Sequence, residues 1–271
     1  MKKYNKNVSV EVLSAWILAI FWISPLLYAF WAAFHPNEYA INFKILAPLT
    51  LSNFFEVWNQ APFARYFLNT FLIVSSILIA QFFVCTLAAY AFARYEFFGS
   101  KILFAIILIQ LMIVPEVLIV ENYTIMSKLN LVDTILGVGL PYMASAFGIF
   151  LLRQTFKTIP KELEEAARVE GCKLFGILLR VYVPLAKPTY LAYALVSVSY
   201  HWNNFLWPLV ITNSVNTRPL TVGLAIFGAP ESGVNWSMIS AATLLSVSPL
   251  LLGFILFQKQ FIQSFMYAGI K

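Results

Sequence analysis

The sequence predicts an all-α integral membrane protein, and three observations lead to that fold class. Hydrophobic residues make up 61% of the 271 residues and charged residues 11%, whereas soluble domains carry about a quarter charged residues. Six segments are long and apolar enough to cross a bilayer, which takes about 20 residues in a helix. Aromatic residues make up 17% of the chain, as belts at the two membrane surfaces require.

Six transmembrane helices are therefore expected in chain order. The predicted spans cover residues 12–34, 67–93, 102–125, 131–152, 188–212 and 238–258. The first resembles a signal peptide in being preceded by lysines, but its apolar run exceeds the about 7–15 residues of a signal sequence, so we interpret it as a retained helix. The chain then divides into an N-terminal segment (1–11), a transmembrane domain (12–258) and a C-terminal tail (259–271).

The positive charges predict the orientation of these spans. With the N-terminus in the cytoplasm, all but four of the 18 Lys and Arg residues lie on the cytoplasmic side, which is the side that such residues favour. The four exceptions are Lys44, Arg65, Lys128 and Arg218. Both termini and the loop after the fourth span are thus expected in the cytoplasm. Because the charges flank apolar segments, they indicate contact with membrane lipid and not with nucleic acid.

The loop at 157–187 is a charged segment between two apolar spans. Pro160 suits the start of a helix, and the strong helix formers that follow predict a helix over 161–170, which Gly171 would end. A second short helix is expected over about 173–181, with Pro184 leading into the fifth span. A solvated connection between two spans is the alternative interpretation of this loop.

The predicted helix at 161–170 has one thin face. On it Leu163, Ala166, Ala167 and Glu170 recur at helical spacing. The two alanines would let a partner protein approach closely. Cys172 follows this helix and Cys85 lies within a span, so no disulfide is expected.

Glu165-Ala166-Ala167, then Gly171 and Pro184, resemble the EAA motif of ABC importer permeases. Glu170 stands where that motif often has Asp, and valines stand at 181 and 183 where it has Ile and Leu. Further similar segments are 148–154, 202–209, 219–224 and 260–262. Together they resemble the smaller six-span permease subunit of the maltose-type carbohydrate uptake family, with some likeness to its glycerol-3-phosphate branch.

This resemblance implies an ABC type I importer permease fold in a bacterial or archaeal cytoplasmic membrane. It implies four kinds of partner: a second homologous permease, two ATPase subunits, an extracytoplasmic solute-binding protein and lipid. The loop at 157–187 would carry the coupling helix that an ATPase subunit grips. The coupling residues carried over are Glu162, Leu163, Glu165, Ala166, Ala167, Arg168, Glu170, Gly171 and Pro184. ATP and Mg would be bound by the ATPase subunits, and no cofactor by this chain.

The residues agree that this chain is not itself an enzyme. No glycine is followed by lysine, so a phosphate-binding loop of the Gly-x4-Gly-Lys-Ser/Thr type is absent from the sequence. The two histidines, His35 and His201, are far apart, and no catalytic or metal-binding cluster is visible.

Polar residues at membrane depth mark candidate solute pathways. Glu116 follows Pro115, which should kink the third span, and broken helices often border a solute path. His201, Trp202, Asn203 and Asn204 offer amide and ring groups suited to sugar hydroxyls. The alternatives are an interfacial position for Glu116 and interhelical packing for the second group. Gln81 and Gln110 are weaker candidates, since single amides usually bond to neighbouring helices.

We therefore expect a permease subunit that imports a sugar, with glycerol-3-phosphate or another polyol phosphate as the second candidate. A self-sufficient secondary transporter and a membrane-embedded enzyme are the competing classes. No inverted repeat supports the former and no catalytic cluster the latter. The outer loop at 35–66 is long enough to touch a docked binding protein, although such loops are often mere connections.

Overall fold

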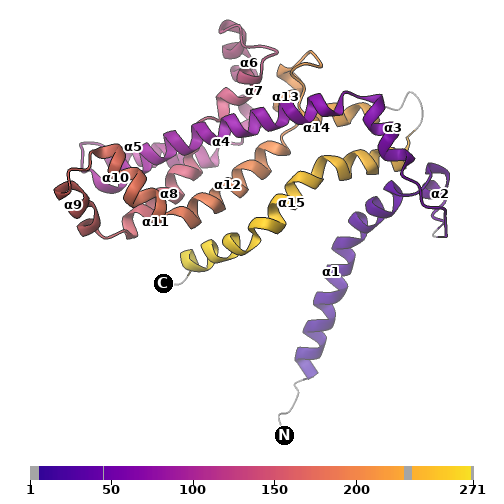
Figure 1. The fold of residues 1–271 in the computed structure, drawn as a ribbon, viewed down its shortest axis with the longest axis horizontal. Coiled ribbons are helices and arrows are strands. Elements are labelled where there is room, and N and C mark those ends of the chain that lie inside the picture. Colours follow the sequence, from indigo (N-terminus) through magenta and orange to yellow (C-terminus); the bar gives the residue numbers. More distant parts are fainter. Residues whose placement is uncertain (1–5, 45, 229–233, 270–271) are drawn as a thin grey trace. The chain divides into compact units, whose positions relative to one another are not determined.

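The computed structural model describes residues 6–44, 46–228 and 234–269, and every regular element in these ranges is a helix (Figure 1). The all-α prediction is therefore confirmed. The predicted terminal segments 1–11 and 259–271 lie partly outside the described residues. The chain divides into two compact units, one formed by Met1–Ala64 with Gly223–Pro249 and the other by Arg65–Val222 with Leu250–Lys271.

The first unit contains the N-terminal helix and two short helices. Its elements are α1 (Lys6–Ala33), α2 (Asn37–Ile41), α3 (Ser52–Gln60) and the first part of α15 (Trp236–Gly269). The C-terminal end of α1 is held by Asn53, whose side-chain amide donates to the carbonyls of Ala33 and His35 at 2.9 Å each. Most of the apolar side chains along α1 are exposed in this chain.

The second unit holds the four middle spans and the charged loop. Its main helices are α4 (Phe63–Arg94), α5 (Ser100–Ile109), α6 (Ile119–Lys128), α7 (Ile135–Gly139), α8 (Ala146–Thr158), α9 (Lys161–Val169), α10 (Leu174–Ile177), α11 (Val183–Leu185), α12 (Lys187–Trp202), α13 (Leu206–Ile211) and α14 (Leu220–Leu224). Short turns connect them: η1 (Gln110–Met112), η2 (Pro115–Leu118), η3 (Leu140–Tyr142) and η4 (Leu178–Tyr182). A further short turn, η5 (Ala225–Gly228), belongs to the first unit. Among these helices α4 is long and unbroken (Figure 1).

Hydrogen bonds define the two ends of the second unit. At one end Arg94 donates to the carbonyl of Ile159, so the last residue of α4 meets the end of α8. At the other end Arg65, near the start of α4, donates to the carbonyl of Asn216 at 3.0 and 3.2 Å. Asp133, between α6 and α7, also binds the loop that follows α13 there. The four spans therefore alternate in direction, as the predicted orientation requires.

Three predicted spans are interrupted instead of continuous. Within the described ranges, the single helices that are long and apolar enough to cross a membrane are Glu11–Ala33, Phe63–Arg94 and Trp236–Leu256. The expected helix at 102–125 is a pair of segments bent by 95°, and the one at 131–152 is a pair bent by 49°. The expected helix at 188–212 ends at Trp202 and resumes at Leu206. The first break directly precedes Pro115, and the second, over residues 143–145, closely follows Pro141. A proline cannot donate to the helical ladder.

The charged loop packs on an apolar core at the Arg94 end of the second unit. Buried side chains of α4 and α8 meet buried side chains of the loop in this cluster. The loop contributes Ala167, Ile177, Leu178 and Tyr182. Since these residues leave water with those of the spans, the loop is part of the bundle and not a free connection.

Candidate functional site

Helix α9 has the end signals that its sequence predicts. Glu162 and Glu164 lie in its first turn and Arg168 in its last, which suits the helix dipole. Gly171 adopts φ +84° directly after the helix. The N–H of Cys172 donates to the carbonyl of Ala167 and the N–H of Gly171 to that of Arg168, both at 2.9 Å. These two bonds form a Schellman motif, so the predicted stop at Gly171 is confirmed.

The side chains of α9 divide into an inner and an outer set. Glu164 and Ala167, three residues apart, are buried. The predicted coupling residues other than Ala167 are exposed, namely Glu162, Leu163, Glu165, Ala166, Arg168, Glu170, Gly171 and Pro184. Val169 is 90% exposed. The expected face of Leu163, Ala166, Ala167 and Glu170 is therefore split, because Ala167 packs against the core of its own chain.

Glu164 is the centre of a hydrogen-bonded cluster at the base of α9. The Tyr90 hydroxyl donates to its Oε1 at 2.7 Å and the Tyr182 hydroxyl to its Oε2 at 2.6 Å. Arg168, one turn along α9, donates to Oε1 at 2.7 Å. Arg94 places its Nε 3.7 Å from Oε2 and also donates to the Tyr182 hydroxyl. We call Tyr90, Arg94, Glu164 and Tyr182 the Glu164 cluster.

The electrostatics of this cluster fix its protonation states. Burial alone would raise the pKa of Glu164, but hydrogen bonds from Tyr182, Arg168 and Tyr90 outweigh it and hold the pKa below its ordinary value. Burial, and then Glu164 itself, raise the pKa of Tyr182. At neutral pH a carboxylate therefore accepts from neutral phenols, and the direction of each hydrogen bond is set.

Sequence reasoning named Glu165 and missed Glu164. The EAA pattern drew attention to Glu165, which is exposed. A signal for Glu164 was present, since Arg168 lies four residues after it and can pair with it on one helical face. The decisive partners, Tyr90 and Arg94, lie in another helix, and no local pattern connects them to α9.

The second helix of the loop is longer than expected. It runs over α10, the π-type turn η4 and α11, ending at Leu185 and not near residue 181. Pro184 lies in this stretch and lacks a backbone N–H, so the regular ladder cannot continue through it. The wider turn over Leu178–Tyr182 precedes the proline, as such irregular turns often do where a ladder is interrupted. This turn also places Tyr182 against α9, where its hydroxyl reaches Glu164.

A cavity of about 430 Å³ opens where the third and fourth spans are broken. Its polar lining residues are Gln81, Gln110, Asn122, Tyr142, Ser145, Tyr193, Ser197, Tyr200 and His201. No Lys, Arg, Asp or Glu is among the described residues that line it. Ile113 and Pro115, at the break of the third span, line it too. Interrupted backbone at membrane depth is tolerated where it borders such a cavity, because water or solute can satisfy the freed groups.

Gln81 of α4 organises the wall of this cavity. The Ser197 hydroxyl donates to its Oε1 at 2.6 Å. Its side-chain nitrogen then donates to the carbonyl of Tyr142 at 2.8 Å and contacts Nε2 of His201 at 3.3 Å. The expectation that Gln81 bonds to neighbouring helices is therefore confirmed. Since Nε2 of His201 accepts, the ring proton lies on Nδ1, which is buried without a partner among the described residues.

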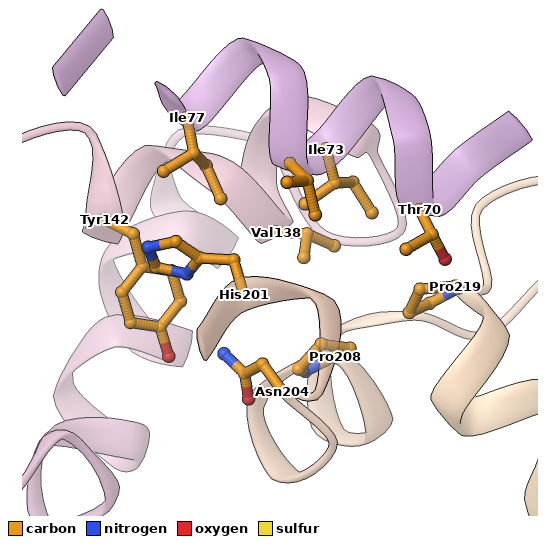
Figure 2. Close-up of a pocket in the computed structure, with 10 residues that line it drawn as sticks. Thr70, Ile73, Ile77, Val138, Tyr142, His201, Asn204, Pro208 and Pro219 are labelled. Carbon is orange, nitrogen blue, oxygen red and sulfur yellow. The ribbon is translucent and has the colours of Figure 1, made fainter. Parts of the chain in front are cut away.

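The predicted pathway residues do not form one group. His201 lines the large cavity and also a small pocket of about 10 Å³, with room for about one water. Figure 2 shows its ring beside that of Tyr142, with Asn204 on the same side of the small pocket. Trp202 is buried with its ring 6.4 Å from that of Phe67. Asn203 is exposed and donates back to its own helix, at the carbonyl of Ser199.

Glu116 lies apart from that group. It is exposed on the turn η2, and its neighbour Pro115 lines the cavity. The kink expected at Pro115 is present as part of the 95° bend. The structure thus brings His201 and Asn204 to one pocket and leaves Glu116 beside the cavity.

Residues 10–266 match the family described as the inner membrane component of binding-protein-dependent transport systems. The chain belongs to this permease family. Membership confirms the resemblance to ABC importer permeases, and it places the chain among multi-pass inner membrane proteins that carry no ATPase of their own. The breaks in its spans and the loop around α9 are therefore features of a transport permease.

Similar proteins are named for the transport of sugars or of glycerol-3-phosphate. The chain is 34% identical to the arabinooligosaccharide transport permease AraQ of Halalkalibacterium halodurans, over 94% of this chain and 93% of that protein. It is 32% identical to the sn-glycerol-3-phosphate transport permease UgpE of Pectobacterium atrosepticum, over 91% of each. A bacterial ABC transporter that imports alginate has a chain of the same fold, with a TM-score of 0.80 at 23% identity, covering 96% of this permease and 99% of that chain.

Proposed function

We propose that this chain is the permease subunit of a binding-protein-dependent ABC importer for a neutral sugar. It works with a second homologous permease, two ATPase subunits that bind ATP and Mg, and an extracytoplasmic solute-binding protein. Both of its termini and α9 face the cytoplasm. The observation that carries the choice of solute is the uncharged lining of the 430 Å³ cavity.

The lining suits a sugar better than a phosphate ester. Amide and hydroxyl groups such as those of Gln81 and Ser197 match sugar hydroxyls as donors and acceptors, and the rings of Tyr142 and Tyr200 can stack on the apolar face of a sugar. A phosphate is usually held by Arg, Lys or a cradle of backbone N–H groups. Among the described residues that line this cavity there is no Lys or Arg. The exposed carboxylate of Glu116 beside it would further repel an anion.

An unpartnered polar atom of the wall supports a role in solute contact. A buried donor without a partner is costly in a finished fold, so the Nδ1 of His201 is suited to hydrogen-bond a passing sugar. Asn204 adjoins His201 at the small pocket. Trp202 and Asn203 then stabilise the end of α12, which carries His201. Trp202 packs against Phe67, and Asn203 caps the helix through the carbonyl of Ser199.

Uptake into proteoliposomes tests the choice of solute. The whole complex, loaded with ATP and supplied with its binding protein, should take up a labelled neutral sugar and not glycerol-3-phosphate. Tyr200→Ala should reduce uptake, whereas the same change at Tyr123, which is exposed but does not line the cavity, should not. Selective uptake of glycerol-3-phosphate would reverse the order of the two solutes. Uptake without ATP or partner subunits would indicate a secondary transporter.

The outer set of α9 residues is proposed to bind an ATPase subunit. Exposure of Val169 and its neighbours supports this, and so does the apolar Leu163 among the exposed residues. In a Cys172→Ser background, a cysteine in place of Val169 should cross-link to the ATPase. A cysteine in place of the buried Ala167 is the matched control and should not react.

A further inference from the structure

We propose that Glu164 is a positioning residue that locks α9 to α4, so that movement imposed on α9 is passed to the wall of the solute cavity. The proposal rests on the proposed function, since it presumes that α9 is gripped by an ATPase subunit. It adds a residue and a route to that function.

The first step of the argument is that the Glu164 cluster joins three separate elements. Tyr90 and Arg94 come from α4, Glu164 from α9 and Tyr182 from η4. Arg94 further binds the carbonyl of Ile159, just before α9 begins. Both carboxylate oxygens of Glu164 are engaged, and each phenol donates to a different one.

The second step is that these contacts resist sliding in a way that apolar packing does not. Apolar contact is non-directional, and on the inner side of α9 it includes the small side chain of Ala167. A shift of α9 relative to α4 by about 1 Å along the Tyr90–Glu164 bond would stretch it from 2.7 Å beyond hydrogen-bonding range. It would also draw the buried carboxylate away from Arg94, and losing these partners is strongly unfavourable. The two helices should therefore move together.

The third step is that α4 continues without interruption to the cavity. Gln81 lies on the same helix, roughly 13 Å from Tyr90 at the helical rise of 1.5 Å per residue. Between them Thr86 bonds to Tyr190 of α12 at 2.5 Å. Gln81 itself holds Tyr142, Ser197 and His201, which line the cavity. One helix thus carries the Glu164 cluster at its end and the cavity wall at its middle.

The test is the number of solutes moved per ATP hydrolysed, measured on the complete complex with its binding protein in proteoliposomes. Glu164→Gln keeps the shape of the side chain and removes its charge. We expect it to co-purify with the ATPase subunits and to hydrolyse ATP, but to transport at least about fivefold less solute per ATP, within the usual range of coupling energies. Glu96→Gln, the same change on an exposed loop residue, should keep the wild-type ratio.

A second variant keeps the test decisive if Glu164→Gln fails to assemble. Tyr182→Phe removes one donor to Glu164 while its ring can keep its contact with Phe156 at 5.0 Å. It should lower the ratio as well. Both changes act on the Tyr182–Glu164 bond, so the double variant should lose less than the sum of the two single losses, although Tyr182→Phe also removes the hydroxyl that accepts from Arg94. Independent, additive losses would count against the lock.

The proposal and the function on which it rests fail in different ways. If assembled Glu164→Gln or Tyr182→Phe complexes transport as much solute per ATP as the wild type, Glu164 is not the link and the proposal is overturned. If the wild-type complex itself shows no ATP-dependent uptake, the proposed function is at fault. A merely structural role would lower the yield of complex but would leave the ratio of the assembled fraction unchanged, and that result would also overturn the proposal.

Discussion

Substitutions at Gly171 can distinguish the effect of backbone strain from the effect of contact with a partner protein. Its φ of +84° is a conformation that L-residues adopt at a cost of about 1–2 kcal/mol. A Cβ added there would meet nothing within 4 Å in this chain. Gly171→Ala should therefore cost about 1–2 kcal/mol at the end of α9 through strain alone. Gly171→Arg has the same backbone cost and a much larger side chain, while Gly171→Asn should cost less, because Asn tolerates this conformation.

These variants can be compared directly because no atom of this chain lies within 4 Å of a side chain's Cβ at position 171. Any steric effect of a larger side chain must then come from a partner. Hydrogen exchange of the α9 amides in the purified complex should rise equally in Gly171→Ala and Gly171→Arg and less in Gly171→Asn. Uptake should fall further with Arg than with Ala, by about tenfold if the partner surface opposes the side chain by about 1.4 kcal/mol. Equal uptake by the Ala and Arg variants would refute the placement of this end of α9 against a partner. Unchanged exchange in the Ala variant would refute the strain argument.

Three further predictions concern other parts of the second unit. Gly148→Ala places a Cβ 2.7 Å from Cζ of Tyr193 and should destabilise the purified protein by about 1–3 kcal/mol in detergent melts, whereas Gly253→Ala meets nothing within 4 Å and should not. Arg94→Ala should cost about 3–5 kcal/mol because the Arg94 side chain, 6% exposed, is part of a buried pair with Glu164. Arg168→Ala should lower the melting temperature much less, because the Arg168 side chain is 52% exposed and water screens its pair with Glu164. Equal melting shifts would contradict the assignment of burial. Burial raises the pKa of Asp133, but hydrogen bonds from Thr217 and from the N–H groups of Ser214 and Asn213 lower it to about 2. The hydrogen bonds between the Asp133 carboxylate and the loop after α13 should therefore contribute fully above pH 3.8 and be lost as the pH falls through about 2. The loss should be measurable as faster hydrogen exchange of the amides at 213–217.

Features set by local backbone chemistry could be predicted from the sequence. The start of α9 after Pro160 and its end at Gly171 follow from the conformations that these two residues favour. The apolar runs likewise predict where membrane helices lie, because a run of about 20 apolar residues is typical of a helix that crosses a bilayer.

Features that depend on distant residues could not be predicted in the same way. Pro115 signalled a kink, but a 95° bend requires a cavity in which the interrupted backbone can be satisfied. The choice between Glu164 and Glu165 as the buried carboxylate depends on where Tyr90 and Arg94 lie. The residues from His201 onward are adjacent in sequence, yet the end of α12 at Trp202 sends their side chains to different surroundings.

The bend in the third span has a consequence for how the protein is made. Its two halves, Ser100–Met112 and Pro115–Lys128, are each roughly 20 Å long at 1.5 Å per residue, shorter than the about 30 Å of a bilayer's hydrocarbon core. Neither half can cross the membrane as a helix of its own. We therefore expect the segment to insert as one apolar run and to bend afterwards, when the neighbouring helices gather around it. On this view the cavity forms only after the chain has been inserted.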